Sequence, residues 1–283
     1  MSTVLDRREP AGRRTLYLVG GVLAGLVFVV PLLVAVVRSL QPNAVVTAAP
    51  DRRFFHLTVA NFGTILQRPE LYRAVLNSLL VSIAAAALTA FLATLAGYGF
   101  AKFRFRGHTV AFGVLMVTMM VPFQAILTPL YLELNALHLT DSRLGLVLFY
   151  STVNLPFSVF VLRTSFATVP PELEDSGHID GAGTARMMLS VLRPLVTPGI
   201  ATAALYTFLA SWTEFLGALT FLTNQDLYTL PVMLVGLQQG AYGQTDFGLL
   251  AAGAVIAMVP CVALYAGLQR YYVSGLVAGS VKG

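Results

Sequence analysis

The sequence predicts an all-α membrane protein with six transmembrane helices and a short cytoplasmic helix between the fourth and the fifth. Three observations lead to this class. Of 283 residues, 57% are hydrophobic and only 11% are charged, whereas about 25% is typical of soluble domains. Six apolar stretches are close to the length of about 20 residues that a helix needs to cross a bilayer. Short segments of alternating polarity, which would indicate a membrane β-barrel, are absent from the sequence.

The apolar stretches define the expected organisation of the chain. The predicted spans are residues 16–37, 74–100, 109–132, 144–162, 195–222 and 247–268. They form a membrane region, 16–268, between an N-terminal tail, 1–15, and a C-terminal tail, 269–283, both expected in the cytoplasm. A hydrophilic segment, 163–194, separates the fourth span from the fifth and forms the large cytoplasmic loop.

Lysines and arginines are more numerous on one side of the predicted spans than on the other, and the side with more of them is expected to face the cytoplasm. With the N-terminus in the cytoplasm, twelve of them fall inside and six outside. The inner set is Arg7, Arg8, Arg13, Arg14, Lys102, Arg104, Arg106, Arg163, Arg186, Arg193, Arg270 and Lys282, and the outer set is Arg38, Arg52, Arg53, Arg68, Arg73 and Arg143. We therefore expect a multi-pass protein of a bacterial-type inner (plasma) membrane with both termini cytoplasmic.

The charges exclude some partners. The net charge of +5 does not indicate nucleic-acid binding, because the basic residues flank apolar spans and form no basic face with interleaved aromatic residues. The first apolar run is too long for the core of a cleaved signal peptide. Cys261 is the single cysteine and the four histidines are scattered, so neither an intramolecular disulfide nor a metal site is predicted.

No catalytic motif is present. Ser176, His178 and Asp180 lie within five residues at a predicted helix end, where a solvated helix end is the ordinary interpretation. A phosphate-binding P-loop needs Gly-Lys-Ser/Thr, and neither lysine, Lys102 or Lys282, is followed by serine or threonine. We expect no enzyme activity and no cofactor in this chain.

Two spans contain features that favour a transport pathway. Pro122 and Pro129 should bend or unwind the third span, and Gln124 adds a polar side chain that cannot face lipid cheaply. The alternative is a kink that only improves packing. Glu214 carries a charge near the middle of the fifth span, and Trp212 beside it could support a sugar ring. The alternative for Glu214 is a structural hydrogen bond to a neighbouring helix.

The segment 163–194 reads as two short helices joined by a glycine turn. Pro170-Pro171 followed by acidic residues is a helix start, because proline suits the first turn and carboxylates favour the positive end of the helix dipole. Asp180-Gly181 supplies the positive φ of a tight turn. A second helix that carries Met187 and Leu192 leads through Pro194 into the fifth span.

These residues resemble the cytoplasmic signature of binding-protein-dependent ABC importer permeases, Glu-Ala-Ala, three residues, Gly, nine residues, Ile, any residue, Leu-Pro. Here it maps onto Asp175-Ser176-Gly177, Gly181, Val191, Arg193 and Pro194, with Asp-Ser-Gly in place of Glu-Ala-Ala and Arg193 in place of leucine. Further segments similar to the maltose-type sugar permeases are Asn77-Ser78-Leu79, residues 101–107, Met120-Val121-Pro122, Pro129-Leu130-Tyr131, residues 212–216 and residues 275–283.

The resemblance implies that the chain is one permease subunit of a carbohydrate importer. Its implied partners are a second permease subunit, two cytoplasmic ABC ATPases on which ATP and Mg act, an extracytoplasmic substrate-binding protein and membrane lipid. The resemblance also implies that the helix of the signature docks in the ATPase. The ATPase-coupling residues are then Glu174, Asp175, Ser176, Gly177, Asp180, Gly181, Ala182, Gly183, Val191 and Pro194. The alternative class is a secondary, ion-coupled transporter, which should show repeated broken helices and several intramembrane ions.

The connection 223–246 contains no lysine or arginine and is rich in small and amide residues. In the maltose-type permeases, the corresponding loop contacts the binding protein. The resemblance therefore implies the same role here, and a plain connecting loop is the alternative. The residues concerned are Gln238, Gln239, Gly240, Tyr242 and Gln244.

Overall fold

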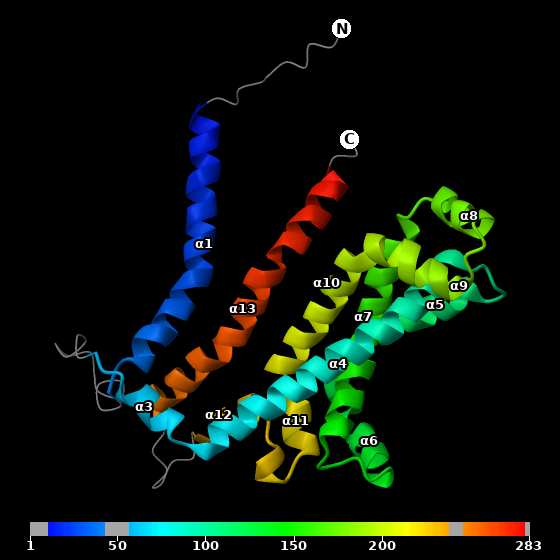
Figure 1. Ribbon diagram of the computed structural model, residues 1–283. Coiled ribbons are helices and arrows are strands. Elements are labelled where there is room, and N and C mark those ends of the chain that lie inside the picture. The colour runs from blue at the N-terminus through cyan, green and yellow to red at the C-terminus, as the bar shows by residue number, and fades with distance from the viewer. Residues whose placement is uncertain (1–10, 43–56, 238–245, 281–283) are drawn as a thin grey trace. The chain divides into compact units, whose positions relative to one another are not determined.

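A computed structural model describes residues 11–42, 57–237 and 246–280, and these residues form helices and their connections without a β-strand. The chain divides into two compact units, residues 1–67 with 237–256, and residues 68–236 with 257–283. Figure 1 traces the elements in chain order.

The first unit contains α1 (Ala11–Ser39), α3 (Ala60–Leu66) and the start of α13 (Phe247–Ser280). The Asn61 amide joins these elements, because its Nδ2 donates to the carbonyl oxygens of Ser39 and Gln41 at 2.8 Å each. Gly248 lies against the same amide: a Cβ there would be 2.7 Å from Asn61 Nδ2. The side chains of Tyr17–Ser39 are exposed over most of their length, and this stretch is apolar enough to span a membrane.

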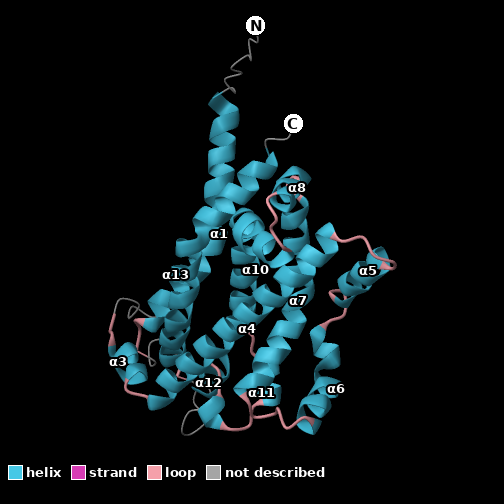
Figure 2. Ribbon diagram, turned by 45° about the vertical axis from the view of Figure 1, so that its right-hand side comes forward, coloured by secondary structure: helices cyan, strands magenta, loops and turns pink. Residues whose placement is uncertain are grey.

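The second unit is built on three long helices, α4 (Pro69–Lys102), α7 (Arg143–Ala167) and α10 (Arg193–Thr213), which pack against one another (Figures 1 and 2). Small side chains on α4, among them Ala85 and Ala93, are fully buried. At Gly97 the approach is so close that a Cβ would lie 2.8 Å from Leu162 Cβ. Small residues let membrane helices pack at short range where lipid offers no hydrophobic driving force.

Shorter elements lie at the two ends of this bundle (Figures 1 and 2). One end, which we call the α8 end, carries α8 (Pro171–Ile179), α9 (Thr184–Arg186) and the start of α10. The opposite end, the α12 end, carries α6 (Phe123–Ala136), α11 (Leu216–Phe221), the 3₁₀ turn η2 (Gln225–Leu227) and α12 (Leu230–Gly236).

The expected third span, 109–132, is broken in the structure. Helix α5 (His108–Thr118) and helix α6 form a pair bent by 97° across residues 119–122. Pro122 is the N-cap of α6 with an extended ψ of 123°, as a residue without an amide hydrogen favours at a helix start. Within the described part of the chain, five helical stretches are long and apolar enough to cross a membrane, and six if the bent pair counts as one.

The fifth span also differs from the expected range 195–222. Helix α10 ends at Thr213, and Glu214 has an extended ψ of 132° before α11 begins. Glu214 therefore occupies a break between two helices rather than the middle of one. At its other end α10 continues from a π-helical segment, η1 (Met187–Leu192). The wider π turn accommodates Pro194, which would clash with the preceding turn of a regular α-helix.

Candidate functional site

Helix α8 has the start and the end that its sequence predicts. Pro171 is its first residue, and Glu172 and Glu174 lie in the first turn. Gly181 has a φ of +74°, and the amide of Ala182 donates to the carbonyl of Gly177 at 2.9 Å. This six-residue bond across a left-handed glycine is a Schellman C-cap, which pairs carbonyl groups that the helix end would otherwise leave free.

Gly177 allows α8 to contact η1. A Cβ on Gly177 would lie 2.5 Å from Met187 Cε and 3.1 Å from its Sδ. Met187 is fully buried in a cluster with Tyr98, Phe166 and Leu192. Glycine at the third position of the signature, where the family has alanine, thus has a steric reason, because it leaves the space that the Met187 side chain fills.

This contact predicts a compensating pair of substitutions. Gly177→Leu should lower the thermal midpoint of the detergent-solubilised protein, since overpacking costs about 1–3 kcal/mol. Adding Met187→Ala should recover part of the loss, so that the double variant is less destabilised than the sum of the two single variants. Strictly additive losses would show that the two side chains do not share this space.

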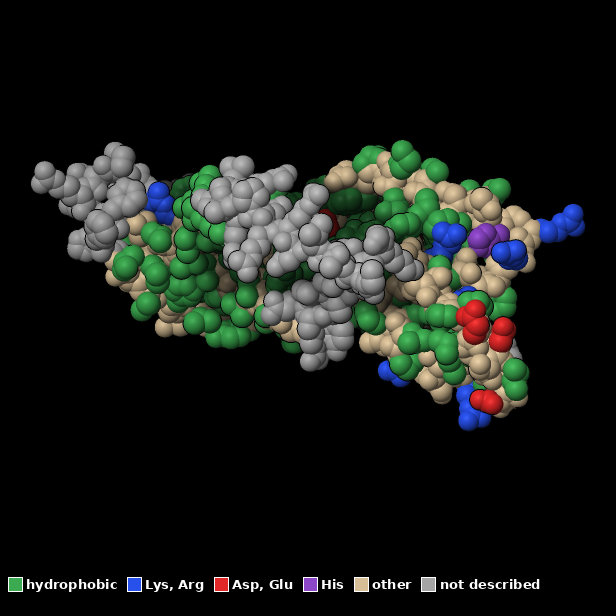
Figure 3. Space-filling model, turned by 90° about the horizontal axis from the view of Figure 1, so that it is seen from above, with side chains coloured by type: hydrophobic (Ala, Val, Ile, Leu, Met, Phe, Trp, Pro, Cys, Tyr) green, Lys and Arg blue, Asp and Glu red, His purple; other side chains and the backbone are tan. Residues whose placement is uncertain are grey.

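The predicted coupling residues separate into inward and outward sets. Ala182 is buried, Val191 is partly buried, and the Glu174 carboxylate is 14% exposed. Asp175, Ser176, Asp180, Gly181, Gly183 and Pro194 are exposed. Near them lie the exposed apolar side chains of Leu173, Ile179 and Leu189. Figure 3 shows acidic and basic side chains gathered on part of the face seen from above.

Glu174 points inward to an ion pair. Lys102 Nζ lies 2.5 Å from Glu174 Oε1 and donates to the carbonyl of Val169 at 3.0 Å. Both charged side chains are about 15% exposed or less. Separating a buried pair of this kind leaves an uncompensated charge, so the contact fixes α8 against the end of α4. The sequence placed Glu174 among docking residues, whereas the structure gives it an internal partner.

A cavity of about 640 Å³ lies beside the broken span. Its lining includes the predicted residues Pro122 and Gln124, and also Phe157 and Tyr206, whose rings pack with centroids 4.2 Å apart. Pockets of about 300–1,000 Å³ are the usual size for small-molecule sites. The remaining lining residues are Leu115, Thr118, Met119, Val121, Phe123, Ile126, Thr152, Val153, Leu155 and Pro156.

Trp212 and Glu214 do not line this cavity. Trp212 is 2% exposed, stacks on Phe208 and donates its Nε1–H to the carbonyl of Ala257 at 3.0 Å. The Glu214 carboxylate accepts from Tyr150 Oη at 2.9 Å and from the amide of Gly217 at 2.8 Å. These contacts favour the structural alternative for Glu214, a carboxylate that caps α11 and bonds to a neighbouring helix. The contacts of Trp212 cover its ring, so the ring is not accessible to a ligand in this chain.

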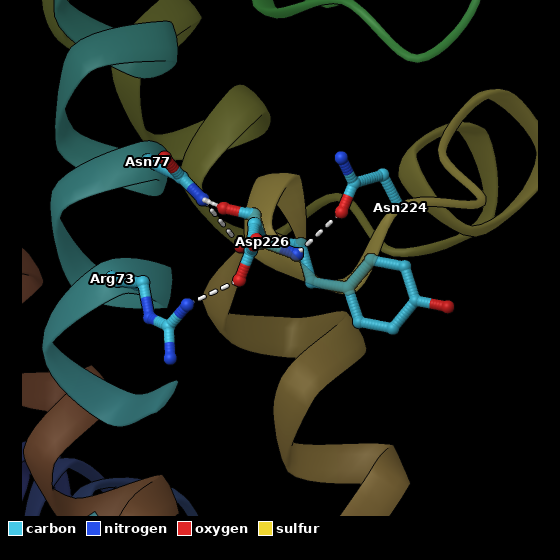
Figure 4. Close-up of polar contacts among 5 residues, drawn as sticks. Arg73, Asn77, Asn224 and Asp226 are labelled. Carbon is cyan, nitrogen blue, oxygen red and sulfur yellow. Dashed lines mark hydrogen bonds and ion pairs between the residues drawn. The ribbon is translucent and has the colours of Figure 1, made fainter. Parts of the chain in front are cut away.

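Sequence reasoning missed a polar cluster at the α12 end. Asn77 is 2% exposed, and its Nδ2 donates to the carbonyl of Asp226 at 2.9 Å (Figure 4). The same Nδ2 donates to the carbonyl of Tyr228 at 3.1 Å, and Oδ1 accepts from Arg143 Nε at 2.9 Å. Arg73, one turn away on α4, forms an ion pair with Asp226. We call these five residues the Asn77 cluster. Its signal in the sequence is two polar residues spaced i, i+4 at the start of an apolar span.

Next to this cluster, Ser78 and Asp141 hold the same connection. Ser78 Oγ accepts from the amide of Leu230 at 2.7 Å. Asp141 accepts from the Thr223 hydroxyl and from the amides of Thr223 and Asn224. These hydrogen bonds lower the pKa of Asp141. The Asp141 contact therefore stabilises the fold above the ordinary carboxyl pKa, and this contribution is lost as the pH falls through the lowered pKa.

The first half of the expected outer connection is thus tied to the bundle rather than free. Its continuation, with Gln238, Gln239, Gly240, Tyr242 and Gln244, lies outside the described residues. Leu230 and Val232, which precede it in α12, are buried.

Comparison with known proteins identifies the class. Residues 89–277 match the family described as "Binding-protein-dependent transport system inner membrane component". The chain is 40% identical over 227 residues to a putative ABC transporter permease protein, ORF1, of Streptomyces antibioticus, covering 80% of this chain and 98% of the relative. It is 30% identical over 269 residues to the arabinooligosaccharides transport system permease protein AraQ of Halalkalibacterium halodurans, covering 94% and 95%.

Among solved structures, the fold is similar to a chain in the crystal structure of a bacterial ABC transporter involved in the import of the acidic polysaccharide alginate. The TM-score is 0.77 at 21% identity, covering 93% of this chain and 99% of that one. This chain belongs to the family of binding-protein-dependent transport system inner-membrane components. It is a permease subunit of an ABC importer and not the subunit that carries out catalysis.

Proposed function

We propose that this chain forms half of the translocation pathway of an importer for a sugar or oligosaccharide. The observation that carries the proposal is the cavity at the broken third span. It combines an aromatic pair with polar groups, the chemistry that a sugar requires, since sugar rings offer apolar C–H faces together with hydroxyl groups. The names of relatives such as AraQ agree with this substrate class.

The polar groups of the cavity suit hydroxyl ligands. The Thr118 and Thr152 hydroxyls donate to carbonyls of their own helices, so their oxygen lone pairs remain acceptors. Gln124 makes no hydrogen bond to another described residue, and its amide offers both a donor and an acceptor. The cavity that the Phe157–Tyr206 pair lines therefore also contains hydrogen-bond acceptors from α5, α6 and α7.

The complex we propose contains a second permease subunit, two cytoplasmic ATPase subunits that bind ATP and Mg, and an extracytoplasmic binding protein. The exposed face of α8, with Asp175 and Ile179, contacts an ATPase together with Asp180 of the turn that follows. The connection beyond α12, through Gln238–Gln244, contacts the binding protein. Both termini are cytoplasmic, and the α8 end is the cytoplasmic end.

Substitutions of Tyr206 test whether the cavity binds the transported sugar. Tyr206→Ala should raise the KM for uptake about five- to tenfold, as expected when an aromatic contact worth about 0.5–1.5 kcal/mol and its buried area are lost. Tyr206→Phe should keep most of the affinity. Tyr265, which lies outside the cavity and is exposed, serves as the matched control as Tyr265→Ala. The assay uses proteoliposomes and a mixture of tritium-labelled arabino-, xylo- and malto-oligosaccharides. An unchanged KM for the Tyr206→Ala variant would show that the cavity is not part of the translocation pathway.

The orientation is tested by cysteine labelling. After Cys261→Ser, a cysteine at Ala241 should react with an impermeant maleimide added to intact cells, because the connection 223–246 is placed outside. A cysteine at Ala185 should react only after permeabilisation. Labelling at Ala185 in intact cells would reverse the orientation.

A further inference from the structure

Helix α4 makes polar contacts at both of its ends. One end contacts the connection that leads into α12, and the other contacts α8, which the proposed function assigns to the ATPase. Near its start, Arg73 and Asn77 hold the connection that contains Asp226. At its last residue, Lys102 holds Glu174 of α8. With 34 residues, a continuous helix is about 50 Å long, enough to cross a bilayer completely.

The interior of α4 contains no proline, because Pro69 stands at its first turn. Each of the other described helices of membrane length contains an internal proline: Pro31 in α1, Pro156 in α7, Pro198 in α10 and Pro260 in α13. Proline removes a helical hydrogen bond and is a usual site of bending. Helix α4 therefore connects the two ends of the bundle without the site of bending that an internal proline would introduce.

Packing keeps α4 in one position along its length. Ala85 and Ala93 are fully buried, and Gly97 approaches α7 closely at the α8 end. A helix held in this way moves as a unit with the groups fixed to its ends, since packed interiors shift between discrete arrangements rather than deform continuously.

We propose that α4 transmits binding-protein docking at the α12 end to the ATPase contact at the α8 end, with the Lys102–Glu174 pair as the joint between α4 and α8. Lys102 is in this sense a positioning residue: it acts on the ATPase through Glu174 and α8. The Asn77 cluster is the joint at the other end. The proposal rests on the proposed function, because it takes α8 and the α12 end as the two partner-binding regions.

The two joints differ in exposure, and this suits their roles. Lys102 and Glu174 are about 15% exposed or less, whereas Arg73 and Asp226 are 50% and 67% exposed. The exposed pair is accessible to a partner that docks at the α12 end, and water screens it, so it can open at little cost. Separating the buried pair costs more free energy, so this pair keeps α8 fixed to α4.

The test measures how strongly the binding protein, loaded with the labelled oligosaccharide mixture, stimulates ATP hydrolysis by the complete complex in nanodiscs. Lys102→Met keeps the apolar stem of lysine and removes its charge. We expect it to lower the stimulation ratio about tenfold, within the usual range of allosteric coupling, while basal hydrolysis per bound ATPase stays unchanged. The swap Lys102→Glu with Glu174→Lys should restore most of the stimulation. Arg104→Ala, on an exposed residue two positions further along, should have no effect.

A double variant tests the transmission itself. If both joints belong to one path, Lys102→Met combined with Arg73→Ala should be no worse than the more damaging single variant. Effects that multiply would mean that the two ends act independently. Full stimulation of the Lys102→Met complex would show that transmission does not need the Lys102–Glu174 pair. Either result overturns the proposal. A wild-type complex that the binding protein fails to stimulate would instead contradict the proposed function.

Discussion

Replacing Gly181 with leucine is expected to leave the protein inserted in the membrane and to abolish coupled uptake. Gly181 has a φ of +74°, and a side chain in the left-handed region costs about 1–2 kcal/mol, which lowers the population of the native turn about five- to thirtyfold. The Schellman bond from Ala182 to Gly177 is lost with this turn. Helix α8 would then present its exposed face in the wrong direction, and less ATPase should co-purify.

The matched control is a second glycine of the same turn. Gly183 has a φ of −68°, and a Cβ added there meets no atom within 4 Å. Gly183→Ala should therefore retain most of the uptake and most of the bound ATPase. Equal damage from the two substitutions would show that side-chain bulk on this surface matters, and not the left-handed conformation of Gly181.

Removing the Asn77 amide should have the second-largest effect. Asn77→Ala leaves Arg143 Nε and the carbonyls of Asp226 and Tyr228 without the partners that they have in the structure. A polar group that loses its partner costs about 1–3 kcal/mol where it is buried. Arg143 and Asp226 are exposed and Tyr228 is partly buried, so water offsets part of this cost. We expect a lower thermal midpoint in detergent, together with a loss of stimulation by the binding protein.

An exposed amide on the same side of the bundle provides the control. Asn135 is exposed, and its Oδ1 accepts only a long hydrogen bond of 3.4 Å from Thr140. Asn135→Ala should change the thermal midpoint little. Asn77→Asp keeps the acceptor toward Arg143 but places a carboxylate against two carbonyls, so it should be at least as damaging as Asn77→Ala. A stable and fully stimulated Asn77→Ala protein would contradict the role given to the cluster.

The parts of the fold that follow from local chemistry could be predicted from the sequence. Hydrophobic runs of bilayer length gave the helical class, and Asp180-Gly181 gave the turn with positive φ, because only glycine adopts that backbone without strain. Pro122 marked the break in the third span. The hydrophobic runs and the glycine turn depend little on what packs around them. Proline is less decisive, because Pro122 stands at the break whereas Pro129 lies inside the continuous helix α6.

The contacts that arise from packing could not be predicted in this way. Glu214 stands in an apolar run of 195–222, so hydropathy alone extends the helix through it, whereas its carboxylate in fact caps α11. The pairing of Lys102 with Glu174 joins residues 72 positions apart in sequence. Asn77 reaches Asp226 across an even longer separation. Without the arrangement of α4, α7 and α10, no pattern indicates which polar residues meet.

The central claim is that this chain transports a sugar only as part of an ATP-driven complex. The direct measurement is uptake of tritium-labelled arabino-, xylo- and malto-oligosaccharides into proteoliposomes that hold the complete complex, with ATP on the side of the ATPase subunits and the binding protein on the other. We predict uptake that requires both ATP and the binding protein, stops with vanadate and is indifferent to a proton uncoupler. Uptake that persists without ATP and collapses with the uncoupler would contradict the account and favour an ion-coupled transporter.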